Sequence, residues 1–136
     1  MTTREDAAGR AQVLDPVRRR WVALTPEEGV RQRLLADLLA LGYPAGLLAV
    51  EKAVVYLGRP WRADVVAYGR DGAARLLAEC KAPGVALSQD TLDQLARYNV
   101  VVGAPTLVLD NGAQRVVVGL GADGWTVRDA LPPFAG

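Results

Sequence analysis

Three short apolar runs between residues 48 and 81 place the strongest constraint on how this chain folds. Each run is too short for a typical helix, and turn residues separate them, first Gly58-Arg59-Pro60 and then Gly69-Arg70-Asp71-Gly72. Glycines at these positions supply the positive φ angles that tight hairpin turns require. We therefore predict three consecutive strands, over residues 48–57, 61–68 and 74–81.

Helices are predicted on both sides of this meander. Thr25 can cap a first helix, Pro26 suits its first turn, and Glu28 stands where a capping box would close. That helix ends near Leu41, before Gly42-Tyr43-Pro44, and a second runs from its cap at Ser88 to about Tyr98. The first presents one apolar face, formed by Val30, Leu34, Leu35, Leu38 and Leu39.

The rest of the chain predicts further strands and one frayed end. We expect strands over residues 100–109, broken by Gly103 and Pro105, over residues 115–119, and a short one within 18–24. Residues 1–11 are polar and are expected to form a flexible tail. No repeat or linker divides residues 1–136, which predicts a single α/β domain with a mixed sheet: helix, three-strand meander, crossover helix, two strands.

Composition excludes several kinds of chemistry. The 136 residues include no histidine and one cysteine, so imidazole-based triads, most zinc sites and an internal disulfide are ruled out. The net charge of +1 provides no global field toward nucleic acid, and binding would need a local basic patch. No apolar run reaches membrane-spanning length and the first residues do not form a signal peptide, so we expect a cytoplasmic protein of bacterial type.

The residues most suited to chemistry lie on two neighbouring strands. Asp64 is on one, and Glu79-Cys80-Lys81 closes the next, with Glu79 and Lys81 on the same face. Two carboxylates and an intervening backbone carbonyl suit Mg²⁺ or Mn²⁺, and a lysine beside that ion can orient an attacking water. The alternative is an ordinary charge pair at a strand end, with Asp64 elsewhere on the surface.

The chain resembles the PD-(D/E)xK nuclease superfamily, and more narrowly the N-terminal nuclease domain of type I restriction enzyme R subunits in a small standalone form. The resemblance covers residues 15 to 120 and consists of matching pieces in the family's order: Leu24-Thr25-Pro26-Glu27-Glu28, Arg31-Gln32, Gly42-Tyr43-Pro44, Val50-Glu51, Arg62-Ala63-Asp64-Val65-Val66, Glu79-Cys80-Lys81-Ala82-Pro83, Asp93-Gln94, Tyr98-Asn99 and Asn111-Gly112. It implies a restriction-endonuclease-like fold. Two departures are Gly29 and Asp110, which replace a large residue and a threonine, and neither removes a metal-binding position.

The resemblance also implies roles for individual residues. Asp64 and Glu79 would bind the metal, Cys80 would contribute its backbone carbonyl, and Lys81 would position or activate the water. Glu28 would approach the metal through water, although as a capping-box residue it has a competing structural role. The pair Gln94 and Tyr98, four residues apart on one helical face, would border the site, with core packing as the alternative for Tyr98.

Several other residues have two interpretations. Glu51 either faces solvent or pairs with Arg62 on the adjacent strand. The segment Arg18-Arg19-Arg20-Trp21 is either a phosphate-binding patch with a stacking ring or a solvated basic turn. Cys80 is interpreted as a small core residue rather than a nucleophile.

The sequence therefore predicts a Mg²⁺- or Mn²⁺-dependent nuclease that hydrolyses DNA, in restriction, defence or DNA processing. RNA stays open as a substrate. A homodimer, or a helicase or translocase of a defence system, are the candidate protein partners, and no membrane is expected. The alternative is a catalytically silent or partner-activated nucleic-acid-binding or assembly module on the same fold, and a third reading is a purely structural interaction protein.

Overall fold

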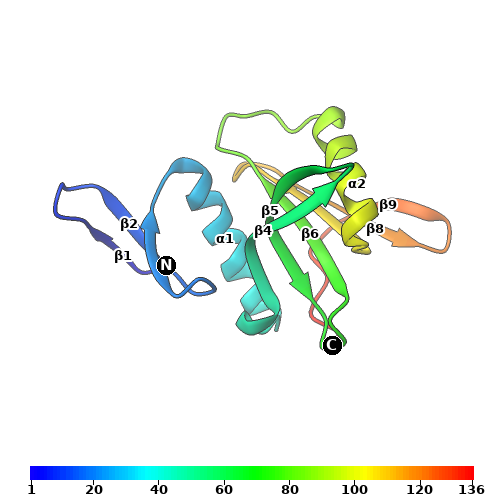
Figure 1. Cartoon of the computed structure of the whole chain (residues 1–136), viewed down its shortest axis with the longest axis horizontal. Helices are drawn as coiled ribbons and strands as arrows, with labels where there is room; N and C mark the ends of the chain where they lie inside the picture. Colours follow the sequence, from blue (N-terminus) through cyan, green and yellow to red (C-terminus); the bar gives the residue numbers. More distant parts are fainter.

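The computed structural model describes residues 1–136 as two sheets and two α-helices (Figure 1). A small N-terminal sheet has the order β1-β2-β3, and the main sheet has the order β4-β5-β6-β7-β8-β9. Only β6 and β7 pair in parallel, and α2 makes the crossover between them. The α/β class and the mixed sheet are thus confirmed. The elements are β1 Thr3–Glu5, β2 Ala11–Asp15, β3 Arg20–Ala23, α1 Pro26–Ala40, a short 3-10 helix Ala45–Leu47, β4 Leu48–Tyr56, β5 Arg59–Tyr68, β6 Ala74–Cys80, α2 Gln89–Val102, β7 Thr106–Asp110, β8 Arg115–Gly121 and β9 Gly124–Arg128.

The two helices cover opposite faces of the main sheet. One core layer joins α1 to side chains such as Val65, Ala78 and Val108, and the other joins α2 to neighbours such as Val66 and Leu77. Because β5, β6 and β7 have apolar groups on both faces, they read as nearly continuous hydrophobic runs in the sequence. The catalytic candidates on β5 and β6 therefore lie in the best-buried part of the fold.

The first helix begins and ends close to the predicted residues. The Thr25 side chain accepts a hydrogen bond from the Glu28 N–H at 3.1 Å, Pro26 is the first helical residue, and Leu41 caps the C-terminus. The Glu28 carboxylate does not complete a capping box, because it bonds to Arg18 and Gln32 instead. Four of the five predicted apolar residues of α1 are buried, and Leu39 is partly buried.

The second helix is longer than predicted. Val100, Val101 and Val102 form its last turn, where we had expected a strand, and Gly103 ends it in the left-handed conformation with φ 73°. The β-branched valines favour strands locally, but the helix that begins at Ser88 continues until a residue that readily adopts positive φ is reached. The predicted strand over 100–109 is accordingly shortened to β7.

Three further strands, β1, β2 and β9, were not in the predicted order. Strand β9 extends the main sheet beyond β8, and β1 lies within the segment predicted to be a flexible tail. Residues Thr3, Arg4 and Glu5 of β1 are all exposed, and their mobility stays a prediction. The turn between β4 and β5 is also tighter than predicted: Tyr56 pairs with Arg59, so β5 starts before Pro60.

The N-terminal sheet is attached to α1 through one buried carboxylate. Asp15 is completely buried and accepts hydrogen bonds from the backbone N–H groups of Val17 and Arg18, from the Arg18 guanidinium and from the Gln32 amide, at 2.7 to 2.9 Å. Burial tends to raise its pKa, but these hydrogen bonds outweigh burial and lower the pKa below the ordinary value. The folded state therefore favours the ionised form of Asp15.

We expect Asp15→Asn to lower the free energy of unfolding by about 3 kcal/mol at pH 7, because it removes one of the two buried carboxylates that neutralise Arg18. The contribution of Asp15 is complete above its pKa in the unfolded chain, about 3.9, and is lost as the pH falls through its lower folded value. Urea unfolding at pH 7 and pH 3 measures both effects. The same substitution at exposed Asp71 is the control, and equal losses in the two variants would contradict this account.

Candidate active site

Asp64 and Glu79 lie where β5 and β6 separate. Pairing of these strands ends at Val65 and Ala78, and the next residues in register are Asp64 and Glu79. Beyond that point an Asp64 carboxylate oxygen, Oδ2, accepts a hydrogen bond from the Cys80 N–H at 2.7 Å, in place of a backbone carbonyl. The two carboxylates predicted to lie together are therefore neighbours at one corner of the sheet.

The backbone of β4 and β5 is irregular at this corner. Ala63 packs on the α2 face and Val65 on the α1 face, although residues two apart in a regular strand share a face. Glu51, across from Asp64 on β4, has φ 54°, an unusual value for a residue other than glycine. The irregularity lets Asp64 turn toward β6 from a strand whose neighbouring side chains are buried.

The environment of the pair disfavours two negative charges. Burial, together with the nearby Asp64 charge, raises the pKa of Glu79 to about 8, and the Lys81 ammonium only partly opposes this. Burial also raises the pKa of Asp64, although the Cys80 N–H and the Arg31 guanidinium act in the opposite direction. A cation bound between the two groups would remove the penalty of holding both ionised.

Three buried side-chain atoms in the chain lack a hydrogen-bond partner, and all three are at this corner. They are Oε2 of Glu79 and Nε and Nη1 of Arg31. Such atoms are uncommon in folded proteins, because each costs free energy that a partner would recover. Their concentration beside Asp64 indicates a site arranged for a ligand.

Arg31 is the site residue that sequence reasoning missed. Its guanidinium lies 3.3 Å from Asp64 Oδ1, 3.5 Å from Glu51 Oε1 and 3.7 Å from Glu28 Oε2. These distances are long for charge-assisted hydrogen bonds, whereas Arg18 and Arg115 make ion pairs at 2.7 to 2.8 Å. Two sequence signals could have found it: its place three residues after Glu28, on the same face of α1, and the Arg31-Gln32 piece of the family resemblance.

Glu28 reaches the site only through Arg31. Its Oε1 accepts a hydrogen bond from Arg18 Nη2 at 2.7 Å, and its Oε2 accepts one from Gln32 Nε2 at 3.2 Å. Glu28 thus belongs to a buried network that continues from Asp15 and Arg18 to Arg31 and Asp64. Whether it also contacts a metal through water stays a prediction.

Lys81 directly follows β6 and points toward the carboxylate pair. Its Nζ is 3.5 Å from Glu79 Oε1, and its backbone N–H donates to the Asp110 carbonyl at 2.8 Å. Asp110 is buried and paired with Arg115, which makes the end of β7 a rigid support for Lys81. About a third of the Lys81 side chain is accessible to solvent, so an external group can reach its ammonium.

Gln94 and Tyr98 lie on α2 beside Glu79. With Trp61, Thr91, Leu95 and Glu79 they line a narrow cavity of about 10 Å³. The Tyr98 ring stacks on Trp61, with centroids 4.0 Å apart and planes at 3°, and meets the edge of Tyr56 at 5.8 Å. Tyr98 therefore packs on two aromatic rings of the β4–β5 hairpin while also bordering the Glu79 cavity.

The surroundings of the remaining candidate residues distinguish between their two interpretations. Cys80 is fully buried in the α1 core layer, and burial raises the pKa of its thiol, which fits a core residue. Glu51 pairs with Arg62 at 3.6 Å as well as with Arg31. Arg18 is committed to Asp15 and Glu28, and the Trp21 ring is covered by Arg4 at 4.1 Å, so only Arg19 and Arg20 of the predicted phosphate patch are exposed.

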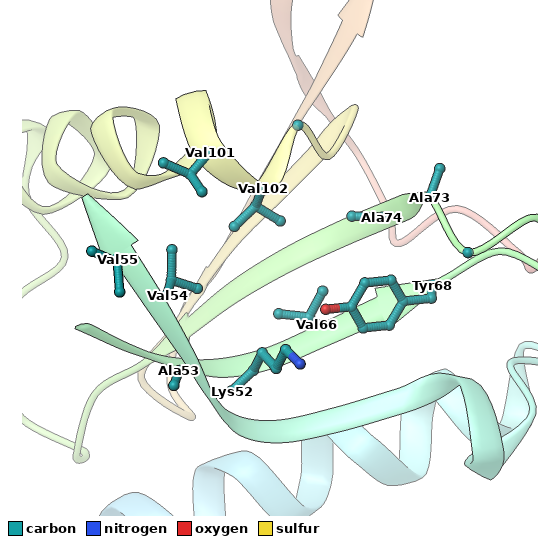
Figure 2. Close-up of a pocket in the computed structure, with 12 residues that line it drawn as sticks. Lys52, Ala53, Val54, Val55, Val66, Tyr68, Ala73, Ala74, Val101 and Val102 are labelled. Carbon is teal, nitrogen blue, oxygen red and sulfur yellow. The ribbon is translucent and has the colours of Figure 1, made fainter. Parts of the chain in front are cut away.

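A larger open cavity, of about 510 Å³, lies elsewhere on the α2 face (Figure 2). It is bordered by β4, the β5–β6 turn and the end of α2, and most of its lining side chains are apolar, such as Val54, Val66 and Val102. Lys52 and Tyr68 are the polar side chains drawn there. Neither converging carboxylates nor orphaned polar atoms occur in it, so size alone does not identify the chemical site.

The donors at the corner fit a hard divalent ion. Asp64, Glu79 and the Cys80 carbonyl offer oxygen ligands, and Glu79 Oε2 has no other partner. No group of three or more His, Cys, Asp or Glu side chains is arranged to hold a metal in this structure. Two carboxylates are nevertheless a normal protein contribution for Mg²⁺, which keeps several of its waters.

Fold and site together define an α/β domain with an acidic pair and a lysine where two strands of a mixed sheet separate. The chain belongs to the family of the type I restriction enzyme R protein N terminus, whose family model matches residues 26–128. The match runs from the start of α1 to the end of β9, so the N-terminal sheet lies outside it. No curated protein and no solved structure matches the chain. None of its helices combines the length and apolarity that crossing a membrane requires.

We expect Glu79→Gln to raise the free energy of unfolding in the presence of a chelator, because the folded wild type must either ionise Glu79 beside Asp64 or keep it protonated well above its ordinary pKa, and glutamine removes that cost. Asp110→Asn is the matched control: Asp110 is also buried, but Arg115 and the Gly112 N–H satisfy its oxygens, so this variant should be destabilised. Urea unfolding at pH 7.5 measures both. A loss of stability in Glu79→Gln equal to that in Asp110→Asn would contradict the conclusion that the Asp64–Glu79 pair destabilises the metal-free protein.

Proposed function

We propose that this protein is a nuclease of the PD-(D/E)xK type that hydrolyses phosphodiester bonds of DNA with Mg²⁺ or Mn²⁺. The observation that carries the proposal is the buried Asp64–Glu79 pair with its orphaned Glu79 oxygen, next to the Lys81 ammonium. Family membership supports a restriction role and a DNA substrate. RNA is a second substrate class to be tested.

Asp64, Glu79 and the Cys80 carbonyl would hold the metal. When bound, the ion would neutralise charge on the scissile phosphate and thereby ease attack by water. The chain's own contribution is positional: the Cys80 N–H fixes one Asp64 oxygen, and Arg31 screens the other. The carboxylates then do not need to reorganise when the substrate arrives.

Lys81 would orient the attacking water and help to transfer its proton. Its ammonium contacts Glu79, is partly exposed and is anchored through its own backbone N–H, so it can donate a hydrogen bond to a water at the phosphate. Hydrolysis forms a bond between that water's oxygen and phosphorus and breaks the ester bond, whose oxygen leaves with a proton. Gln94 and Tyr98, which border the Glu79 cavity, would limit how the substrate enters.

The decisive experiment is cleavage of circular and linear duplex DNA, single-stranded DNA and RNA with Mg²⁺ or Mn²⁺. We expect wild-type cutting to stop in chelator, and Lys81→Gln to cut about 10²–10⁴-fold more slowly because a proton-handling group is lost. Calorimetry should detect metal binding to the wild type but none to Asp64→Asn. Arg75→Gln is the control for general damage, since Arg75 pairs only with Asp71, in the β5–β6 turn at the opposite end of these strands from Asp64 and Glu79.

A silent or partner-activated module on the same fold is the second candidate. It is favoured by the family description, which is that of one terminal region of a restriction enzyme R protein. A helicase or translocase subunit, or a second copy of the chain, would then complete the activity. Metal binding that Asp64→Asn abolishes, without cleavage by the isolated chain, would support this alternative. Cleavage unaffected by Lys81→Gln would overturn the assignment of Lys81.

A further inference from the structure

The turn between β4 and β5 contains a residue that the turn itself disfavours. Leu57 and Gly58 form a two-residue loop with φ values of 50° and 75°, so both central residues are left-handed. Turns of this type prefer Asn or Asp before Gly, because a leucine side chain is strained at positive φ. Leu57 is also 83% exposed, so burial does not compensate for the strain.

The outer part of the same hairpin is basic and lacks acidic residues, although Glu51 and Asp64 lie farther along its two strands. From residue 52 to residue 62 it includes Lys52, Arg59 and Arg62, but no Asp or Glu. Lys52 and Arg59 are exposed and make no ion pair, whereas the Arg62 side chain is 75% exposed and reaches only Glu51, at 3.6 Å. Lys52 and Arg59 are therefore free to meet an external anion, and Arg62 is exposed enough to exchange its long contact with Glu51 for such an anion.

The cations lie on both faces of the hairpin. Lys52 shares a face with Val54, which packs toward α2, and lines the open cavity beside β4 (Figure 2). Arg62 follows Trp61, which also packs on that side, and so alternation places it on the opposite face. A two-stranded ribbon with cations on both faces complements a groove of duplex DNA, where phosphates line both walls.

The hairpin is held rigidly next to the acidic pair. Tyr98 of α2 stacks on Trp61 of β5 and meets Tyr56 at the end of β4. Trp61 also lines the cavity that contains Glu79, and Arg62 is two residues from Asp64 on the same strand. A strand of DNA that contacted the hairpin would therefore pass the proposed metal-binding carboxylates.

We propose that the β4–β5 hairpin is the duplex-DNA-binding arm of this protein. Lys52, Arg59 and Arg62 contact backbone phosphates, and Leu57 enters the groove as an apolar wedge between base steps. Apolar wedges of this kind unstack a base step and bend the duplex. The proposal deepens the nuclease function proposed above by assigning its substrate-binding surface, but DNA binding itself requires neither metal nor cleavage.

The test measures binding of a fluorescent DNA duplex by anisotropy in chelator, from 50 to 200 mM salt. The variant Lys52→Gln/Arg59→Gln/Arg62→Gln should bind more weakly and lower the slope of log K against log salt by about 2 to 3, nearly one for each phosphate contact. The control Arg10→Gln/Arg19→Gln/Arg20→Gln changes the net charge of the chain by the same amount, from +1 to −2, but its three exposed positions lie in or beside the N-terminal sheet. Its slope should stay within about 0.5 of the wild type.

Leu57→Asn tests the wedge separately. It creates the Asn-Gly pair that this turn prefers, so we expect thermal stability to be unchanged or higher, which excludes misfolding as the cause of any loss. Affinity for duplex DNA should fall about tenfold without a change in salt slope, since an apolar contact releases no counterions. A single-stranded probe should lose much less.

Each opposing result overturns one named part of this proposal. Equal slopes in the two triple variants would overturn the assignment of the arm, and wild-type affinity in Leu57→Asn would overturn the wedge. Equal losses on single-stranded and duplex probes, or preference for an RNA duplex, would overturn the choice of duplex DNA. These outcomes are independent of the nuclease proposal, which is tested by metal-dependent cleavage. If the protein cuts DNA but none of the binding results is as expected, the active-site proposal stands and the proposal of a DNA-binding arm is overturned.

Discussion

The hydrogen bond from the Cys80 N–H to the Asp64 carboxylate is the interaction on which the site depends. It takes the place of a backbone partner where β5 and β6 stop pairing, and so fixes the acidic side chain at the corner of the sheet. Glu79 is then held beside Asp64 in a buried setting that raises its pKa. A flexible loop could relax that repulsion, whereas two strands packed between helices cannot.

Buried charge also connects the N-terminal sheet to this corner. Asp15 and Arg18 are tightly paired, Arg18 holds Glu28, and Glu28 approaches Arg31, which contacts Asp64. The ion pairs of Arg18 are short and those of Arg31 are long. The network is therefore rigid at the N-terminal sheet and loosely satisfied at the site, and the orphaned nitrogens of Arg31 mark that transition.

Local signals predicted elements whose ends have a strong chemical cause. The Thr25-Pro26 start of α1 is an example, because the cap and the ring act within one turn. The predicted end of α2, at about Tyr98, was wrong. Val100 to Val102 favour strands by propensity but complete the helix in the folded chain. Pairing of β9 with β8, and of β1 with β2, depends on contacts between segments that turn signals alone did not reveal.

The sequence by itself determined the chemical inventory: no imidazole, one thiol, and Asp64, Glu79 and Lys81 on adjacent strands joined by a tight turn. Strand alternation and hairpin geometry act over a few residues, so the neighbourhood of the two carboxylates followed from them. Only the tertiary structure decided the place of Arg31, because its carboxylate neighbours come from α1, β4 and β5. Burial and the electrostatics of the pair were decided there as well, since solvent is excluded only when helices from distant parts of the chain cover both faces of the sheet.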